Sequence, residues 1–294
     1  MAGPVARSGK PHPPAGAIDC GPTTDDLVGA QFIAPTGGWG IPGRLLPVLP
    51  TIAILAAVLL AWEAVVRLWQ VPAYMMPGPS AVLIRLVSDP GFFGREGLVT
   101  LLEALAGLGV GGLLALGAGL LMARWRWLER ALLPVAIVAK VTPVVVVAPL
   151  FVLWFGFGAW PRVLIAALLA FFPILIGAVA GLRAVPTAAH EVLLTLDASA
   201  AEETLLLRLP SALPQLFAAL KVATTLALLG AVVAEWVGGD RGLGRAILLA
   251  NSNLDTVTAL AGVATIAVIG MAMIGALSLL ERRYVFWQAP LDRS

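Results

Sequence analysis

Among the charged side chains inside the long apolar runs of this 294-residue sequence, two are the residues best placed to do chemistry in a membrane. Lys140 lies in the run from 132 to 155, and Glu235 lies near the end of the run from 213 to 237. An ionised side chain in the bilayer costs about 2.5 to 3.5 kcal/mol on insertion scales, so both should face protein or water. They are candidates for a pathway across the membrane or for an ion pair that locks two helices.

Pro143 adds a second feature to the run that contains Lys140. A proline inside a helix frees backbone carbonyl groups, and such groups are tolerated in a membrane where they line a cavity or meet a neighbouring helix. With Lys140 nearby, this run is our first choice for a pore-lining element.

The elements that must position these residues are apolar helices. Hydrophobic residues make up 60% of the chain and charged residues 12%, with a mean hydropathy of +0.94, which excludes a soluble domain and a disordered chain. Runs of about 20 apolar residues match the bilayer, and they do not alternate as barrel strands would. We predict an all-α, polytopic membrane protein with six transmembrane helices, at 45–66, 100–122, 132–155, 161–182, 213–237 and 256–280.

The remaining segments are short or polar. Residues 1–44 are rich in Pro and Gly and are predicted to form a disordered tail, residues 45–288 to form the membrane domain, and residues 289–294 a C-terminal tail. Cys20 is the only cysteine, so no disulfide forms within the chain and no metal site is expected. The balanced charge argues against a nucleic-acid partner, which leaves membrane lipid as the expected surroundings.

Lys and Arg are unevenly distributed between the two sets of connecting segments. The set that includes both termini and the 183–212 loop carries eleven, and the opposite set carries six. This bias favours both termini in the cytoplasm. The 183–212 loop is then the longest cytoplasmic connection, and its pattern predicts two short amphipathic helices, after which Pro210 and Pro214 turn the chain back into the membrane. The loop is either an interfacial anchor or a docking surface for a soluble partner.

At this loop the sequence resembles the inner-membrane permease subunits of ATP-binding-cassette (ABC) importers, in the branch that handles sulfonates, nitrate, taurine, and thiamine-pyrimidine or riboflavin-type compounds. That family has a twenty-residue cytoplasmic loop that begins with Glu and ends in Leu-Pro, with glycine at the seventh position. Here the loop runs from Glu191 to Leu209-Pro210, and Asp197 replaces the glycine. Aspartate is one of the few residues that tolerates the left-handed turn that glycine permits. Further segments resemble the family in the same order: 76–80, 140–143, 149–150, 153–158, 232–236 and 239–244.

The resemblance implies a transport subunit with no catalytic residues and no bound cofactor. It implies a homodimer of permease copies, two ATPase subunits that use ATP and Mg and grip the loops at Glu191, Asp197, Leu209 and Pro210, and an extracytoplasmic substrate-binding protein. The location implied is the cell inner membrane. The segment 239–244 favours a vitamin precursor as substrate, whereas Lys140 suits sulfonate or nitrate, so both remain open.

Two other classes were weighed against this one. An intramembrane protease is disfavoured because His12 and His190 lie outside the apolar runs and no helix supplies a pair of buried aspartates. An ion-coupled secondary transporter remains the alternative, with Lys140 and Glu235 as its coupling residues, although no internal repeat is evident.

Overall fold

The computed structural model describes residues 48–141, 143–185 and 187–287, and every regular element among them is a helix. From Ala53 onward these residues belong to one compact unit. A π-helical segment, Thr204–Arg208, lies between α8 and α9 and is called the π segment here. The α-helices in chain order are α1 (Val48–Leu68), α2 (Pro79–Ser88), α3 (Pro90–Arg124), α4 (Arg126–Val141), α5 (Val144–Phe155), α6 (Ala159–Arg183), α7 (Thr187–Thr195), α8 (Ala200–Glu203), α9 (Leu209–Gly238), α10 (Leu243–Ser252) and α11 (Thr256–Tyr284).

The all-helical membrane fold is confirmed, but the count of six spans is not. Among the described residues, five helices are long and apolar enough to cross a membrane. They are α1, α3, α6, α11 and the continuous helix that contains α9. The run predicted at 132–155 is instead two helices, α4 and α5, of 16 and 12 residues. Pro143 separates them with a non-helical ψ of 114°. Proline has no N–H to continue the ladder and disfavours helix at the residue before it.

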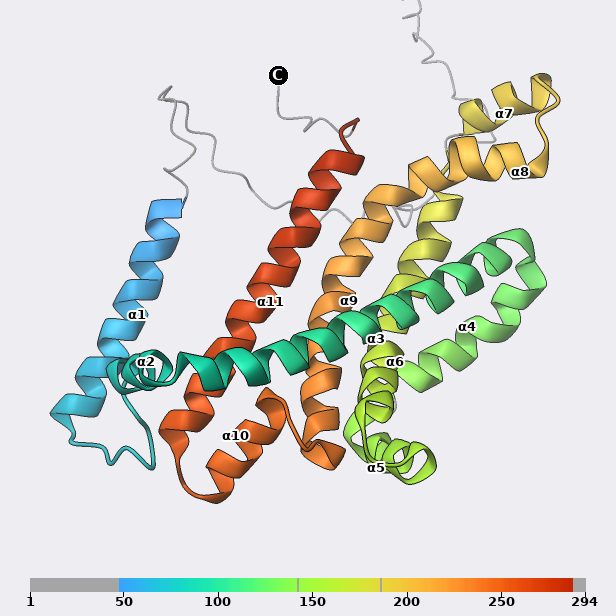
Figure 1. Cartoon of the computed structure of the whole chain (residues 1–294). Coiled ribbons are helices and arrows are strands. Elements are labelled where there is room, and N and C mark those ends of the chain that lie inside the picture. Colours follow the sequence, from blue (N-terminus) through green and yellow to red (C-terminus); the bar gives the residue numbers. More distant parts are fainter. Residues whose placement is uncertain (1–47, 142, 186, 288–294) are drawn as a thin grey trace, which may run out of the picture. The chain divides into compact units, whose positions relative to one another are not determined.

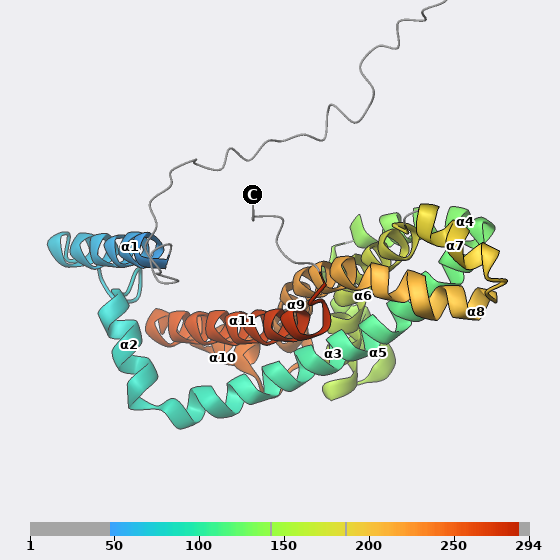
Figure 2. The same ribbon diagram turned by 90° about the horizontal axis from the view of Figure 1, so that it is seen from above.

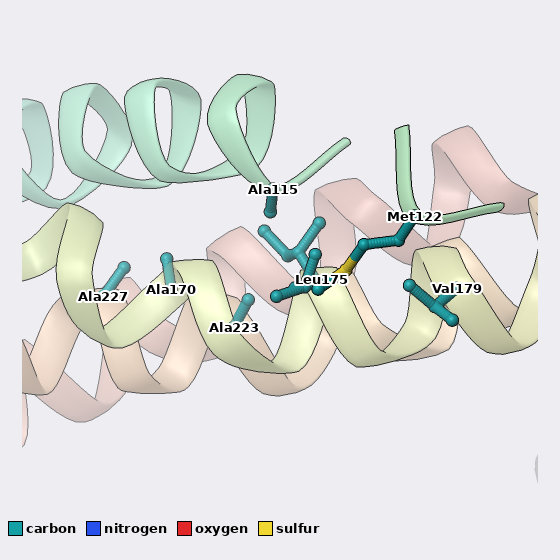
Figure 3. Close-up of a cluster of buried hydrophobic side chains, with 8 residues drawn as sticks. Ala115, Met122, Ala170, Leu175, Val179, Ala223 and Ala227 are labelled. Carbon is teal, nitrogen blue, oxygen red and sulfur yellow. The ribbon is translucent and has the colours of Figure 1, made fainter. Parts of the chain in front are cut away.

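The core lies where α6 packs against α3 and α9 (Figure 1). Small side chains fill it, and Figure 3 shows alanines of all three helices surrounding Leu175, with Met122 and Val179 beside it. Glycines of α3 let the helices approach closely, because a Cβ at Gly111 would lie 2.4 Å from the carbonyl oxygen of Ala167 on α6. Packing of small residues is the main source of helix association in lipid. The glycines of α3 therefore serve a contact within the chain.

The short helices lie at opposite ends of the long ones. In Figure 1, α7, α8 and the end of α11 lie on one side, and α2, α5 and α10 lie on the other. Figure 2 shows α3 running past α11 and α9 toward α4, α7 and α8. The broken pair that replaces the helix predicted at 132–155 begins with α4 on the α7 side and ends with α5 on the α10 side (Figure 1).

Acidic side chains cap the helices on the α10 side. Asp89 accepts from the Phe92 N–H at the start of α3, and Asp255 accepts from the Thr258 N–H at the start of α11. Hydrogen bonding to Thr258 holds the pKa of Asp255 below its ordinary value. Glu63 of α1 accepts from the Ser80 N–H at 3.0 Å and so caps α2 from a different helix. These caps satisfy N–H groups that have no partner within their own helix.

Candidate coupling and translocation sites

Glu235 is fully buried near the end of α9, and its carboxylate is held by donors from its own chain. The Thr100 hydroxyl of α3 donates to its Oε1 at 2.7 Å, and the Gly244 N–H donates to its Oε2 at 2.5 Å. Thr100 Oγ1 in turn accepts from the Leu243 N–H at 2.9 Å. Glu235 therefore fastens the start of α10 to α3 and α9, and both of its oxygens already have partners.

The glycines of the 239–244 segment are explained by this arrangement. Gly242 has a φ of +106°, which L side chains rarely adopt, and its N–H donates to Glu96 Oε2 at 2.6 Å. A Cβ on Gly242 would lie 2.2 Å from the carboxyl carbon of Glu235, and one on Gly244 would lie 2.5 Å from the Val232 carbonyl oxygen. Three successive N–H groups at the start of α10 thus bind acidic or hydroxyl side chains of the long helices. We call Glu96, Thr100 and Glu235 the outer-loop anchor, because the distribution of Lys and Arg predicts that the loop they hold lies on the extracytoplasmic side.

Arg162 forms the second buried charge group on the same side of the molecule. Its guanidinium lies 2.7 Å from Glu103 Oε1 on α3, and it reaches Asp240 Oδ1 at 3.2 Å and the Arg241 carbonyl oxygen at 3.3 Å. The Arg162 and Glu103 side chains are 6% and 7% exposed, whereas Asp240 is 78% exposed. Because a buried charge needs a partner, this pair ties α3 to α6, and its contact with the 239–244 segment extends to the surface.

Lys140 and Pro143 lie at the break between α4 and α5. Lys140 belongs to the last turn of α4, and its side chain lies outside the described residues, so its pairing with Glu235 stays a prediction. Pro143 is exposed and stands at the N-cap of α5, without a side-chain cap for that helix. The helix ends that meet here leave backbone groups unpaired within the helix, which in a membrane requires cover by protein or water.

The segment from 183 to 212 contains two short helices, as the sequence predicts. Glu191 is exposed on α7. Asp197 has a φ of +52°, so it adopts the left-handed conformation that glycine would favour at this position. The Ser199 hydroxyl and N–H both bind Glu202, which caps α8. The geometry matches a helical pair joined by a tight turn and displayed at one end of the molecule (Figure 1).

Leu209 and Pro210 do not turn the chain as expected. Helix continues from α8 through the π segment into α9, and Leu209 and Pro210 form the first positions of α9. Pro210 lacks an N–H for the Leu206 carbonyl, and the turn before it widens, so that the Leu209 N–H bonds to the Thr204 carbonyl five residues back. In place of the helix break predicted at Leu209 and Pro210, one continuous helix changes there from π to α hydrogen bonding.

Ion pairs link the long helices on the α7 side. Arg183 at the end of α6 pairs with Glu129 of α4. Lys221 Nζ lies 2.5 Å from Glu281 Oε2, which joins α9 to α11. Lys221 is therefore an interhelical tie.

The residues that sequence reasoning missed are those that act across long separations. Thr100 and Glu96 meet residues 143 and 146 positions further along the chain. Arg162 lies at the very start of the run from 161 to 182 and is counted as a loop charge in the distribution of Lys and Arg. The available signal was the presence of Arg162 and Glu103 in two different apolar runs, since oppositely charged residues in a bilayer are expected to pair.

The described residues contain no group of three or more His, Cys, Asp or Glu side chains able to hold a metal. Two apolar cavities, of about 580 and 440 Å³, lie along α11, the first against α1 and α2 and the second against α3. Neither cavity is lined by Glu96, Thr100 or Glu235, so both lie apart from the anchor.

Comparison with known proteins decides the class. Residues 111–286 match the family described as "Binding-protein-dependent transport system inner membrane component". The chain belongs to this family of ABC permease subunits. The riboflavin transport system permease protein RibX of Chloroflexus aurantiacus is 38% identical over 83% of this chain and 91% of its own length. The formylaminopyrimidine transport permease protein ThiX of Halalkalibacterium halodurans is 30% identical over 81% of this chain and 95% of its own.

The fold of this permease is also that of a solved transporter. The structure titled "Inward facing conformations of the MetNI methionine ABC transporter" matches it with a TM-score of 0.57 and 18% identity, over 68% of this chain and 97% of the other. Relatives named for aliphatic sulfonates, taurine and nitrate match as well, which confirms the branch that the sequence motifs indicated. The permease is thus a multi-pass membrane component of a transport system.

Proposed function

We propose that this permease forms the translocation path of an ABC importer for a small organic solute and that ATP hydrolysis by separate subunits drives it. The observation that carries the proposal is the exposed helical pair around Asp197, which continues through the π segment into α9. A soluble motor that moves this pair acts directly on a helix that spans the membrane. At its far end the same helix holds the outer-loop anchor through Glu235.

The motor subunits are proposed to grip α7 and α8 from the cytoplasm, with Glu191, Asp197, Leu209 and Pro210 as the coupling residues. The exposed carboxylate of Glu191 on α7 offers a contact for a basic partner surface. ATP and Mg would be used by the partner. Both termini are proposed to be cytoplasmic. The connecting segments that include both termini and the 183–212 loop carry the excess of Lys and Arg, and α11 ends on the same side as α7 (Figure 1).

A second copy of the chain is proposed to complete the path. The broken α4–α5 backbone at Pro143 needs cover within the membrane, and α1 has no buried residue in its apolar window in the single chain. Lys140 and Pro143 then line the path, while Glu235 shapes its outer end by holding α10. An extracytoplasmic binding protein is proposed to deliver the solute on the α10 side, where Asp240 and Arg241 are exposed.

The substrate class that we favour is a vitamin precursor of the riboflavin or pyrimidine type. Support comes from the names of RibX and ThiX, which this chain resembles over most of its length. A sulfonate, nitrate or taurine is the alternative, for which the cationic Lys140 is the supporting residue.

Lys140→Met distinguishes a role of Lys140 in the translocation path from a role in locking two helices together. If Lys140 lines the path, uptake falls while assembly and membrane level persist. Loss of assembly instead supports a structural lock.

The test of the proposal is purification of the tagged chain from its native membrane in mild detergent, with mass spectrometry of its partners. A stoichiometric ATPase is the expected companion. Glu191→Lys should release that ATPase while the chain stays inserted, and Arg95→Glu, a charge reversal at an exposed position near the start of α3, should not. Recovery of the chain without any ATPase, or unchanged ATPase binding and uptake in Glu191→Lys, would contradict the docking assignment.

A further inference from the structure

The π segment stands between the exposed helical pair and the long helix α9, and its register differs from that of both neighbours. Its hydrogen bond from the Leu209 N–H closes on Thr204, five residues back. Single π turns inside α-helices are uncommon and occur often at functional sites. Here the cause is local, because the ring of Pro210 excludes the carbonyl four residues earlier.

An ion pair stabilises this register. Arg208 donates from Nε and from its terminal nitrogen to Oε1 of Glu203, at 2.9 and 2.7 Å. The Glu203 and Arg208 side chains are 16% and 30% exposed. In an α-helix, positions five apart lie about 140° from each other around the axis. A π turn closes on the fifth residue and brings them to the same face. The pair therefore favours the π register over the α register.

The surroundings leave room for a change. A cavity of about 110 Å³ lies between the π segment and the ends of α3 and α6, and Glu203, Thr204 and Arg208 line it. On the other side, the turn at 196–199 is largely exposed and is able to take up one displaced residue. Pro210 and the Glu203–Arg208 pair thus both favour the π register, and the cavity and the exposed turn leave space on either side of the segment.

We propose that residues 203–208 are a register joint, which converts from π to α when the ATPase subunits move the helical pair. This inference rests on the proposed function, because the ATPases supply the driving force. Because an α turn needs one residue fewer than a π turn, conversion shifts the chain by one residue toward the 196–199 turn, which takes up the extra residue. It turns α7 and α8 by about 100° and moves them by about 1.5 Å relative to α9. The joint is a two-state element that ligand-driven closure biases.

The experiment measures the register directly by cross-linking cysteine pairs in a chain whose Cys20 is replaced by serine. One variant carries Glu203→Cys with Arg208→Cys, and the other carries Glu203→Cys with Leu207→Cys. Both variants lose the Glu203–Arg208 ion pair, so Pro210 alone holds the π register in them. A fluorogenic reagent that must react with two thiols reports which pair is close. Each chain is reconstituted in nanodiscs with the ATPase that copurifies with it, without nucleotide and then with ATP and vanadate.

We expect the 203/208 pair to dominate without nucleotide and the 203/207 pair to dominate after trapping. The ratio of the two products should change by about tenfold. Pro210→Ala restores the missing N–H and should shift the ratio toward 203/207 without nucleotide. Pro214→Ala is the matched control, because Pro214 also lies inside α9 but no π turn precedes it. It should behave like the parent chain.

The outcomes separate the two proposals. A ratio that stays constant while the bound ATPase hydrolyses ATP and uptake proceeds overturns the register joint and leaves the proposed function standing. Pro210→Ala without any effect on the ratio removes the cause assigned to the π turn and also overturns it. Failure of any ATPase to bind the parent chain overturns the proposed function, and with it the force that the joint requires.

Discussion

Gly111→Ala on α3 tests the claim that close contact between α3 and α6 holds the core together. The added Cβ would lie 2.4 Å from the Ala167 carbonyl oxygen and 3.1 Å from the Ala167 Cα and carbonyl carbon. Ordinary contact begins at 3.4 Å, so the two helices must separate by about 1 Å at this point. All three neighbours are backbone atoms, which no side-chain rotation can move away. Overpacking of this kind costs about 1 to 3 kcal/mol.

Gly109→Ala is the matched control, because nothing lies within 4 Å of a Cβ there. In a helix interior, alanine is favoured over glycine by about 0.5 to 1 kcal/mol, so this variant should be as stable as the parent or slightly more stable. The assay is the thermal unfolding midpoint of both variants in the same detergent. The same helix preference applies to Gly111→Ala, so the overpacking cost appears as the difference between the two variants. At about 2 to 4 °C for each kcal/mol, Gly111→Ala should unfold about 2 to 12 °C below Gly109→Ala. Equal midpoints for the two variants would refute the packing argument.

Three further predictions concern the α10 side of the molecule. Arg162→Met leaves Glu103 buried without its cation and should destabilise the fold by about 3 to 5 kcal/mol, whereas the double variant with Glu103→Met should recover most of the unfolding midpoint; no recovery would contradict the pairing. Gly242→Ala should abolish uptake, because the new Cβ overlaps the Glu235 carboxyl group at a φ of +106°; normal uptake and a normal midpoint would show that the anchor is dispensable. Asp255 has a lowered pKa, so its cap on α11 is fully stabilising above the ordinary value of 3.8 and is lost as the pH falls through the lower folded value. The midpoint difference between the parent and Asp255→Ala should therefore vanish in strong acid, and a difference independent of pH would argue against a charged cap.

The apolar runs predict most of the fold because the bilayer fixes helix length from composition alone. Three predicted runs agree with the observed spans to within a few residues. The spans of α3 and of the helix that contains α9 begin ten and twelve residues earlier than predicted, α3 because Asp89 and Pro90 start it. The run from 132 to 155 failed because hydropathy does not register the missing N–H of Pro143.

The site is predictable only where a local backbone rule applies. The left-handed turn at Asp197 follows from the position of glycine in the family loop, and the structure has it. The outer-loop anchor could not be predicted, because Glu96, Thr100 and Glu235 reach α10 through tertiary contacts that no periodicity encodes. Glu235 was singled out for the cost of its charge in a membrane, and the structure shows that it meets that cost with hydrogen bonds to Thr100 and Gly244.

The most direct test of the account is solute uptake by proteoliposomes that contain the purified complex and the solute-loaded binding protein that accompanies it. ATP is supplied on the side that exposes α7, and a proton or sodium gradient is applied in separate vesicles without ATP. The account predicts uptake that requires ATP, stops when the ATPase is removed and does not respond to either gradient. Uptake driven by an ion gradient in the absence of ATP would contradict it and would make Lys140 and Glu235 candidate coupling residues of a secondary transporter.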